Sequence, residues 1–289
     1  MNCGIVVVLY HPDIQHVQSL IDGFIHCEWP IVLVDNSSEK TVLSLSSHCQ
    51  YFHYPENVGI AEAQNVGLNY LFKNGLSHAV VLDQDSLFTV NMAVDLLAQY
   101  HELERSHKIA ALGPSIHCQF TDKVAVGRVQ KGRQIDSKVR EVKQIIASGM
   151  MLSSSAFSKV GNKETGLFID GVDHEWCWRA NKLGFSIFQS LSVCMPHRQG
   201  DDRVKVLGLT FKQGAPIRLY YQMRNVLLLA RRGYVPLYWK CRHLPAIPLR
   251  YIVNRFYFPD GKKRGHYLLK GLADGISAKK GKIQEPSIK

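Results

Sequence analysis

The sequence predicts an α/β fold: a mostly parallel central sheet with helices on both faces, followed by a basic, mainly helical C-terminal region. Apolar runs of strand length alternate with amphipathic segments of helix length, an order typical of parallel strands joined by helices. The runs at residues 6–8 and 31–34 are continuously apolar, as strands covered on both faces require. Charge separates residues 203–289 from residues 1–202.

The alternation assigns the elements in chain order. The expected strands are residues 4–10, 31–35, 51–54, 79–83, 109–112, 124–129, 145–152 and 185–194. The expected helices are residues 14–24, 41–47, 60–73, 89–105 and 173–183, with residues 119–142 expected to be rich in loops. Asp13 is a candidate N-cap, while Asn74-Gly75 and Gly184 are typical helix ends.

Composition excludes several classes of protein. The chain has 289 residues, 46% of them apolar, so it can bury a large core. No apolar run approaches the roughly 20 residues that cross a bilayer, and no secretory signal pattern is evident, so we expect a cytoplasmic protein. The seven cysteines are an odd number without a Cys-x-x-Cys pair, which predicts neither a disulfide framework nor a zinc knuckle.

The net charge of +11 is unevenly distributed. Residues 203–289 hold 19 Lys and Arg against three acidic residues, a net charge of +16, whereas residues 1–202 carry 16 basic and 21 acidic residues, a net charge of −5. This predicts two regions that divide near residue 202. The acidic first region disfavours a nucleic-acid-binding module, which is the non-enzymatic alternative.

Polar residues follow the predicted strands where each one ends. Ligands of open α/β sheets bind outside the carboxyl ends of the strands, so we expect Tyr10, Asp35, Asn57, Gly59 and Asp83 to border one crevice. No Gly-x-Gly-x-x-Gly and no P-loop motif occurs at a strand-to-helix turn. A dinucleotide oxidoreductase and a P-loop phosphotransferase are therefore disfavoured.

The triplet Asp83-Gln84-Asp85 places two carboxylates one residue apart at a strand end. Oxygen ligands suit Mg²⁺ or Mn²⁺, which keep coordination positions open for substrate phosphates. The alternative is an ordinary Asx-turn. Asp35 is a candidate to accept a hydrogen bond from a pyrimidine imide or a ribose hydroxyl, with capping of the following turn as the alternative.

Five ordered motifs carry a family resemblance: VVLYHPD, VDNSS, ENVGIAEAQNVG, DQDS and FIDGVDHEWCWRA, followed by YYQMRN and GLADGI. They resemble the motifs of inverting glycosyltransferase family 2, in its bacterial rhamnosyltransferase-like branch. The resemblance implies a GT-A fold, a nucleotide-sugar donor and a divalent metal. It makes residues 1–202 the nucleotide-sugar-binding and catalytic domain, and residues 203–289 an acceptor- or membrane-associated region.

The resemblance also implies roles for the donor-side residues. Asp35 resembles the pyrimidine contact, and Asn57 and Gly59 belong to the loop beside the base and ribose. Asp83 resembles the sugar- or ribose-facing member of the metal motif, and Asp85 resembles its direct metal ligand. His197 stands where many relatives place a further metal or diphosphate contact, with a purely structural histidine as the alternative.

On the acceptor side, spacing back from Arg179 selects Asp173 as the counterpart of the family's catalytic base. Val172 stands where many relatives carry Glu, so the sequence departs from the family pattern, and Asp170 is a candidate to substitute in part. The alternative is that Asp173 only caps its helix. Glu175 and Arg179, at i and i+4, are expected to form a helix salt bridge or to orient the base.

The resemblance implies an inverting enzyme that moves a deoxyhexose, L-rhamnose from dTDP-rhamnose, onto a saccharide or lipid-linked acceptor in surface-polysaccharide biosynthesis (O-antigen, lipopolysaccharide or capsule). Gly149 falls in the segment that resembles the acceptor-side loop, with an ordinary strand as the alternative. Other candidates are a different nucleotide-sugar-dependent hexosyltransferase and a sugar-nucleotide pyrophosphorylase. The pyrophosphorylase is disfavoured because residues 10–13 do not form a glycine- and arginine-rich loop.

Basic and aromatic residues are mixed throughout residues 233–270. The mixture suits an amphipathic surface that lies on anionic lipid, which would place the protein at the inner face of the cell membrane. Single-stranded nucleic acid and a solvated helical cap are the alternatives.

Overall fold

The computed structural model describes residues 2–118, 123–124, 132–197, 203–206, 209–212 and 214–284. Its main element is a ten-stranded sheet in the order β3-β2-β1-β4-β9-β5-β10-β8-β7, with β6 paired to β5. The strands are β1 (Cys3–Leu9), β2 (Ile31–Asp35), β3 (Cys49–His53), β4 (His78–Asp83), β5 (Ile109–Cys118), β6 (Lys123–Val124), β7 (Arg133–Gln134), β8 (Val139–Val142), β9 (Met150–Ser153) and β10 (Ser186–His197).

The sheet combines a parallel part with a mixed part. β1 to β4 are parallel to one another, and β5 is parallel to β10. β9 runs antiparallel between β4 and β5 and joins the two parts. The α/β fold class predicted from the alternation of elements is confirmed, and the parallel strands β1, β2 and β4 end at the edge where the candidate site lies.

Helices cover both faces of the sheet, as predicted. Alternate residues of β1 point to opposite sides, so Val7 packs in a core with α1 (Ile14–Gly23) and α3 (Val90–Glu104). Val6 packs in a second core, which is shared with α2 (Ile60–Lys73), α4 (Ser154–Val160) and α5 (Val172–Lys182). The two cores fix the sheet between two helical layers.

Three predicted elements differ in the structure. The helix expected at residues 41–47 is wrong, because side chains take the backbone N–H groups a helix would need: Thr41 donates to Asp35 and Ser44 donates to Gln18. The strand expected at residues 145–152 begins only at Met150, after a turn. Most of the strand expected at residues 124–129 lies outside the described residues.

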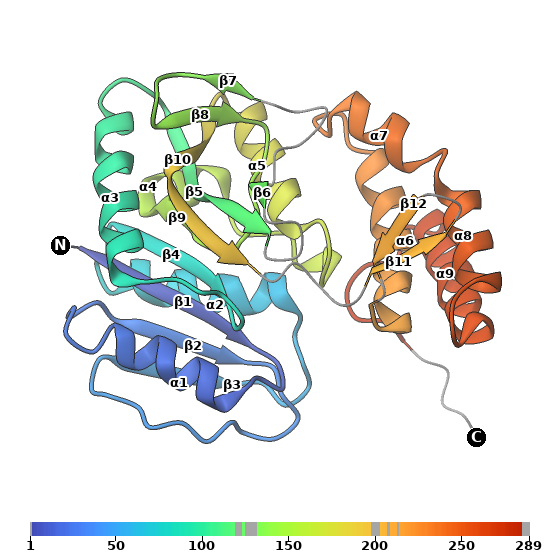
Figure 1. Cartoon of the computed structure of the whole chain (residues 1–289), viewed down its shortest axis with the longest axis horizontal. Coiled ribbons are helices and arrows are strands. Elements are labelled where there is room, and N and C mark those ends of the chain that lie inside the picture. The colour runs from blue at the N-terminus through green and yellow to red at the C-terminus, as the bar shows by residue number, and fades with distance from the viewer. Residues whose placement is uncertain are drawn as a thin grey trace.

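The C-terminal region is mainly helical, as expected, and lies beside the sheet (Figure 1). Its elements are β11 (Arg203–Val206), β12 (Leu209–Lys212), α6 (Pro216–Ala230), α7 (Leu237–His243), α8 (Ile247–Phe256) and α9 (Gly261–Ile276). Gly271, which has no side chain, allows α6 and α9 to pack closely. A Cβ at this position would lie 2.4 Å from the carbonyl oxygen of Tyr220. Among the described residues, no helix combines the length and apolar character needed to span a membrane.

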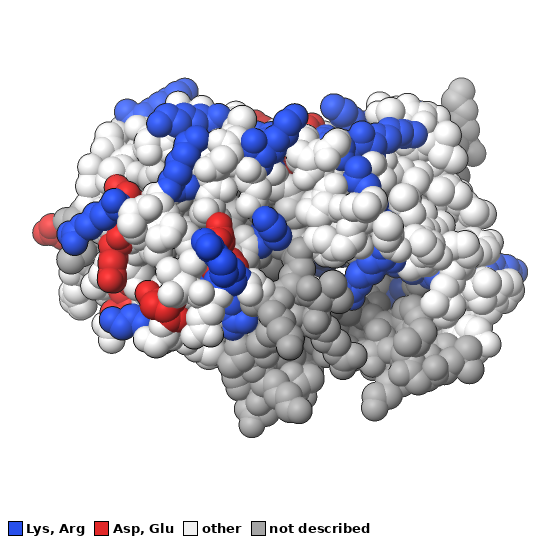
Figure 2. Space-filling view, turned by 90° about the horizontal axis from the view of Figure 1, so that it is seen from above, with Lys and Arg blue, Asp and Glu red and all other residues white. Residues whose placement is uncertain are grey.

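The surface reflects the uneven charge of the sequence. On the face in Figure 2, acidic side chains lie mainly over the sheet half, whereas Lys and Arg side chains lie over both halves. The charged side chains visible on the C-terminal half of this face are therefore mainly basic.

Candidate active site

The carboxyl ends of β1 and β4 are joined by one side chain. The amide group of Gln84 accepts from the N–H of Tyr10 at 2.6 Å and donates to the carbonyl oxygen of Tyr10 at 3.2 Å. His11, with φ of 46°, donates its N–H to the Ser37 hydroxyl just after β2. Three strand ends thus meet at one edge, and the half-exposed Tyr10 ring lies there.

Asp35, at the end of β2, is fully buried. Its carboxylate accepts hydrogen bonds from the N–H groups of Ser37 (2.8 Å) and Thr41 (3.0 Å) and from the Tyr51 hydroxyl. Burial alone raises the pKa of Asp35, but hydrogen bonds from Ser37, Thr41 and Tyr51 outweigh it and lower the pKa to about 2. Asp35 is therefore ionised at neutral pH and fixes the turn that follows β2.

The loop containing Asn57 and Gly59 is held by the Asn36 side chain. The Asn36 amide accepts from the N–H of Val58 at 3.1 Å and donates to the carbonyl oxygen of Gly59 at 3.3 Å. Gly59 has φ of 85°, and a Cβ there would lie 2.5 Å from the Phe168 ring. Glycine is therefore required by both backbone conformation and contact, and the loop packs against the segment that precedes α5.

The turn after β4 carries the two carboxylates of the Asp83-Gln84-Asp85 triplet. Asp83 is half-buried, and its Oδ2 accepts a hydrogen bond from the Ser148 hydroxyl. Asp85 is exposed, and its carboxylate has no hydrogen bond or ion pair with the part of the chain that the structure describes. An exposed carboxylate next to a positioned one fits the hard oxygen ligands that Mg²⁺ and Mn²⁺ prefer.

Asp173 lies in the first turn of α5 and is bound by two donors. Its Oδ2 accepts from the N–H of Ala147 at 3.1 Å, and its Oδ1 accepts from Nζ of Lys163 at 3.0 Å. The Lys163 side chain is 0% exposed and the Asp173 side chain is 23% exposed. The N-cap of α5 is Gly171, and no side chain caps the helix, so the capping alternative for Asp173 is wrong.

The turn at residues 147–149 connects the two carboxylate sites. Ala147 donates to Asp173, and its neighbour Ser148 donates to Asp83. Gly149 donates its N–H to the carbonyl oxygen of Val81 at 3.0 Å, which anchors the turn to β4. Because adjacent residues contact both carboxylates, the turn places Asp83 close to Asp173.

Gly149 is explained by its backbone. Its φ is 82°, and a Cβ would lie 2.6 Å from Cγ of Pro114, so a side chain would collide with the neighbouring strand. The role on the acceptor side that the resemblance implies for Gly149 stays a prediction.

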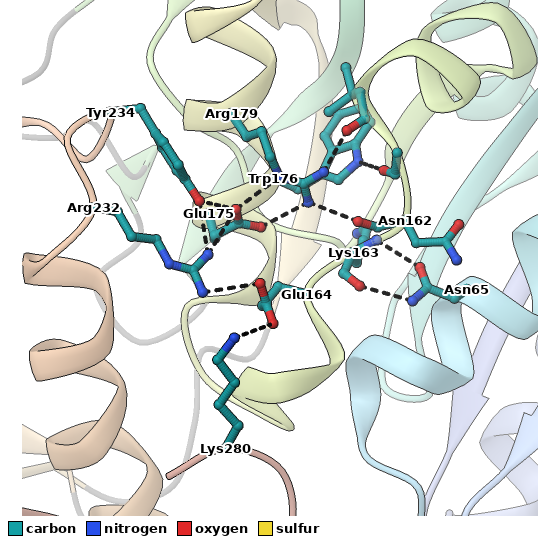
Figure 3. Close-up of polar contacts among 12 residues, drawn as sticks. Asn65, Asn162, Lys163, Glu164, Glu175, Trp176, Arg179, Arg232, Tyr234 and Lys280 are labelled. Carbon is teal, nitrogen blue, oxygen red and sulfur yellow. Dashed lines mark hydrogen bonds and ion pairs between the residues drawn. The ribbon is translucent and has the colours of Figure 1, made fainter. Parts of the chain in front are cut away.

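Glu175 points away from Asp173, because residues two positions apart lie on opposite sides of a helix. It is fully buried and is bound by Arg179, by Arg232 and by the Tyr234 hydroxyl at 2.6 Å (Figure 3). Burial and the hydrogen bond to Glu175 raise the pKa of Tyr234 to about 12, so the phenol remains a donor at neutral pH. The expected Glu175–Arg179 salt bridge is confirmed. Arg232 and Tyr234, which also bind Glu175, tie α5 to the C-terminal region.

The motif YYQMRN supplies the second connection to α5. The Asn225 amide donates to the carbonyl oxygens of Leu167, Ile169 and Asp170, all in the segment that precedes α5. The Asp170 carboxylate is paired with Arg218 at 2.8 Å. Asp170 is thus held in an ion pair with α6.

Sequence reasoning missed three functional contributors. The ammonium group of Lys163 and the hydroxyl of Ser148 contact the two key carboxylates, and the Gln84 side chain fastens Tyr10. No local pattern marks Lys163. Ser148 and Gln84 lie beside the predicted site residues Gly149, Asp83 and Asp85, but the motifs give these two side chains no role of their own. His197 ends β10, and its side chain lies outside the described residues.

Comparisons with known proteins identify the family. No protein-family model matches the chain. The chain is 31% identical over 257 residues to the dTDP-rhamnosyl transferase RfbF of Shigella flexneri, which covers 84% of this chain and 86% of that protein. The chain belongs to the bacterial rhamnosyltransferase-like branch of glycosyltransferase family 2.

Two further comparisons agree with this membership. The glycosyltransferase is 23% identical over 224 residues to the low-salt glycan biosynthesis hexosyltransferase Agl10 of Haloferax volcanii, over 71% of this chain and 69% of that protein. Its fold resembles a crystal structure of GalNAc-T7 with UDP, GalNAc and Mn²⁺, with a TM-score of 0.55 and 14% identity. The match covers 96% of this chain and 56% of that one, and it confirms the GT-A fold.

Proposed function

We propose that this glycosyltransferase moves L-rhamnose from dTDP-rhamnose onto a hydroxyl of a saccharide or lipid-linked acceptor, with inversion at the anomeric carbon. The name of the relative RfbF supports the donor. The contacts of the turn at residues 147–149 support the proposal, because adjacent residues of this turn bind the candidate base Asp173 and Asp83, the member of the metal motif that would face the ribose or the sugar. An inverting transfer needs both groups at one anomeric carbon, one on the leaving-group side and the other on the acceptor side.

On the donor side, Tyr10, Asn57, Gly59 and the turn fixed by Asp35 would border the nucleotide. Since Asp35 is already bound by three donors, we assign it first to holding this turn and second to a direct contact with the pyrimidine. Asp83 would face the ribose or the sugar. Asp85, together with His197, would hold Mg²⁺ or Mn²⁺, which when bound supplies Lewis-acid stabilisation of the charge on the departing diphosphate.

On the acceptor side, Asp173 would take the proton from the attacking hydroxyl. Its two donors, Ala147 and Lys163, orient the carboxylate and keep it on the side of α5 that faces the 147–149 turn. General bases typically contribute 10²–10⁴-fold to a rate. Glu175 is fully buried and bound by two arginines, and Asp170 is paired with Arg218, which supports Asp173 as the base.

Sugar transfer from a panel of nucleotide-sugar donors, measured with Mn²⁺ and with a chelator, tests this function. Asp173→Asn should bind the donor as the parent does and lose transfer by about 10²–10⁴-fold. Asp85→Ala should lose metal-dependent donor binding, and Asp95→Asn, an exposed carboxylate on α3, is the matched control for both. Preference of the parent for another donor sugar would reject rhamnose, and full transfer by Asp173→Asn would reject the base.

We also propose that the C-terminal region attaches the enzyme to an anionic membrane surface at the inner face of the cell membrane, where a lipid-linked acceptor would lie. Leu249, Ile252 and Phe256 of α8 are 42%, 48% and 67% exposed at i, i+3 and i+7, so they share one outward face. Lys262 and Lys263 are exposed at the start of the neighbouring α9. Apolar residues flanked by lysines are typical of a helix that lies in the lipid interface.

Flotation with vesicles tests the attachment. Binding should be stronger to anionic than to neutral lipid and should fall with salt, because each basic residue near the surface contributes on the order of 1 kcal/mol. Phe256→Ser should weaken binding, whereas Val42→Ser, which changes an 81% exposed residue of the sheet domain, should not. Equal flotation of the two variants would reject α8 as the contact.

A further inference from the structure

A second group of chemically active side chains lies away from the candidate active site. His78 begins β4, whereas Asp83 ends the same strand, so the two residues are about 17 Å apart at 3.3 Å per residue. His101 and Glu104 come from the last turn of α3, which packs beside the start of β4. The group therefore lies at the opposite edge of the sheet from the donor crevice.

The three side chains converge on one point. Nδ1 of His101 lies 3.0 Å from Oε2 of Glu104, and Nε2 of His78 lies 3.7 Å from the same oxygen. One ligand atom from each residue lies within 4.8 Å of the other two. Ligands around a tetrahedral zinc ion are about 3.3 Å apart, so small rotations of the exposed His101 and Glu104 side chains would complete that geometry.

The hydrogen bonds of His78 determine which ring nitrogen carries the proton. The Ser77 hydroxyl has one hydrogen, which it donates to the carbonyl oxygen of Asn2 at 2.9 Å. The 3.0 Å contact between this hydroxyl and Nδ1 of His78 therefore requires Nδ1–H as the donor. In the neutral ring, Nε2 then presents a lone pair.

That lone pair is buried against a carboxylate. The His78 side chain is only 7% exposed, and its Nε2 has no hydrogen-bond partner among the described residues. In the neutral ring, this buried acceptor faces the Glu104 carboxylate, an arrangement that a cation between the two atoms would stabilise. A histidine that donates its other nitrogen to a hydroxyl matches the second-shell support usual for metal-binding histidines.

We propose that His78, His101 and Glu104 form a Zn²⁺ site that is separate from the catalytic metal ligands. Two imidazoles among three ligands suit zinc, whereas Mg²⁺ and Mn²⁺ favour sets in which oxygen ligands predominate. The ion would join β4 to α3, and because His101 and Glu104 are about half exposed, water would fill the remaining coordination position. Its role would be structural, since the active-site edge lies at the other end of β4.

Titration of the untagged, chelator-stripped full chain with Zn²⁺ tests the site. The titration uses the Asp85→Ala variant as its background protein, because this substitution removes the candidate metal ligand of the active site and so prevents zinc from binding there. In that background we expect one Zn²⁺ per chain, and Co²⁺ should give the visible absorption of a tetrahedral site. His101→Ala and Glu104→Gln should each weaken Zn²⁺ binding at least tenfold and abolish the rise in melting temperature that Zn²⁺ causes.

His266→Ala is the matched control, because His266 is an exposed histidine on α9. It should bind Zn²⁺ as the Asp85→Ala background does. Both test residues are also exposed, so their variants should fold, and circular dichroism checks this. Absence of tight Zn²⁺ binding in the Asp85→Ala background, or equal binding by His101→Ala and His266→Ala, would overturn the proposal.

Discussion

The Lys163–Asp173 ion pair predicts an unequal response to removal of its two partners. Lys163 is 0% exposed, whereas Asp173 is 23% exposed and keeps a second donor in Ala147. Asp173→Asn leaves a buried ammonium group beside an amide and the Met150 sulfur at 3.7 Å. Lys163→Met leaves a carboxylate that water can reach. We therefore expect Asp173→Asn to destabilise the fold more than Lys163→Met.

The magnitudes follow from burial. Removing one partner of a buried ion pair typically costs 3–5 kcal/mol, and the residual amide contact lowers this to about 2–4 kcal/mol for Asp173→Asn. Lys163→Met should cost about 1–2 kcal/mol, because Asp173 is partly solvated. The double variant has neither charge and should come within about 1 kcal/mol of the parent. At about 2 °C per kcal/mol, the melting temperature should fall by about 4–8 °C for Asp173→Asn, by about 2–4 °C for Lys163→Met and by at most about 2 °C for the double variant.

Thermal and urea unfolding of the parent, the two single variants and the double variant measure this cycle, and transfer assays on the same proteins add a second readout. If Lys163 acts on catalysis only through Asp173, the double variant should transfer no more slowly than Asp173→Asn. Additive losses of stability, or a Lys163→Met variant less stable than Asp173→Asn, would refute the reasoning.

Three further predictions concern stability. The pKa of Asp35 is lowered from 3.8 to about 2, so its ionised form should stabilise the fold by about 2 kcal/mol above pH 4. This stabilisation should be lost between about pH 4 and pH 2. The free energies of unfolding of the parent and of Asp35→Asn, measured with urea, should therefore become more similar over that pH range. Gly149→Ala should cost at least about 1 kcal/mol, and more than Gly75→Ala, which has a similar φ but nothing within 4 Å of the added Cβ. Glu175→Gln should cost at least about 2 kcal/mol in thermal unfolding, because two guanidinium groups lose their buried counter-charge.

Local patterns were sufficient for most elements of the sheet domain. The helix at residues 60–73 has the bounds that its apolar spacing and the following Asn74-Gly75 predict. Strand-end residues were found because the direction of a parallel strand decides which end faces the crevice. The helix predicted at residues 41–47 does not form, because the backbone N–H groups of Thr41 and Ser44 donate to the side chains of Asp35 and Gln18, both outside that segment. Local propensity could not anticipate such distant acceptors.

Lys163 shows why the candidate site could be predicted only in part. Its backbone is fixed by two hydrogen bonds with the Asn65 amide, from a residue 98 positions away, and its ammonium group then meets Asp173. Neither contact has a sequence spacing that repeats. Asp173 was found through a family motif, whereas its partner depends on the packing of α2 against the segment before α5, which only the tertiary structure specifies.

The C-terminal region differs in composition from the sheet domain, but it contacts α5, the helix that carries the candidate base. Asn225 fixes the segment that leads into α5, and Arg232 and Tyr234 bind Glu175 on the side of α5 away from Asp173. The change in charge near residue 202 therefore distinguishes the surfaces of the two regions. The contacts that hold the helix of the candidate base nevertheless join residues from both sides of that boundary. The position of α5, and with it that of Asp173, therefore depends on side chains of both regions.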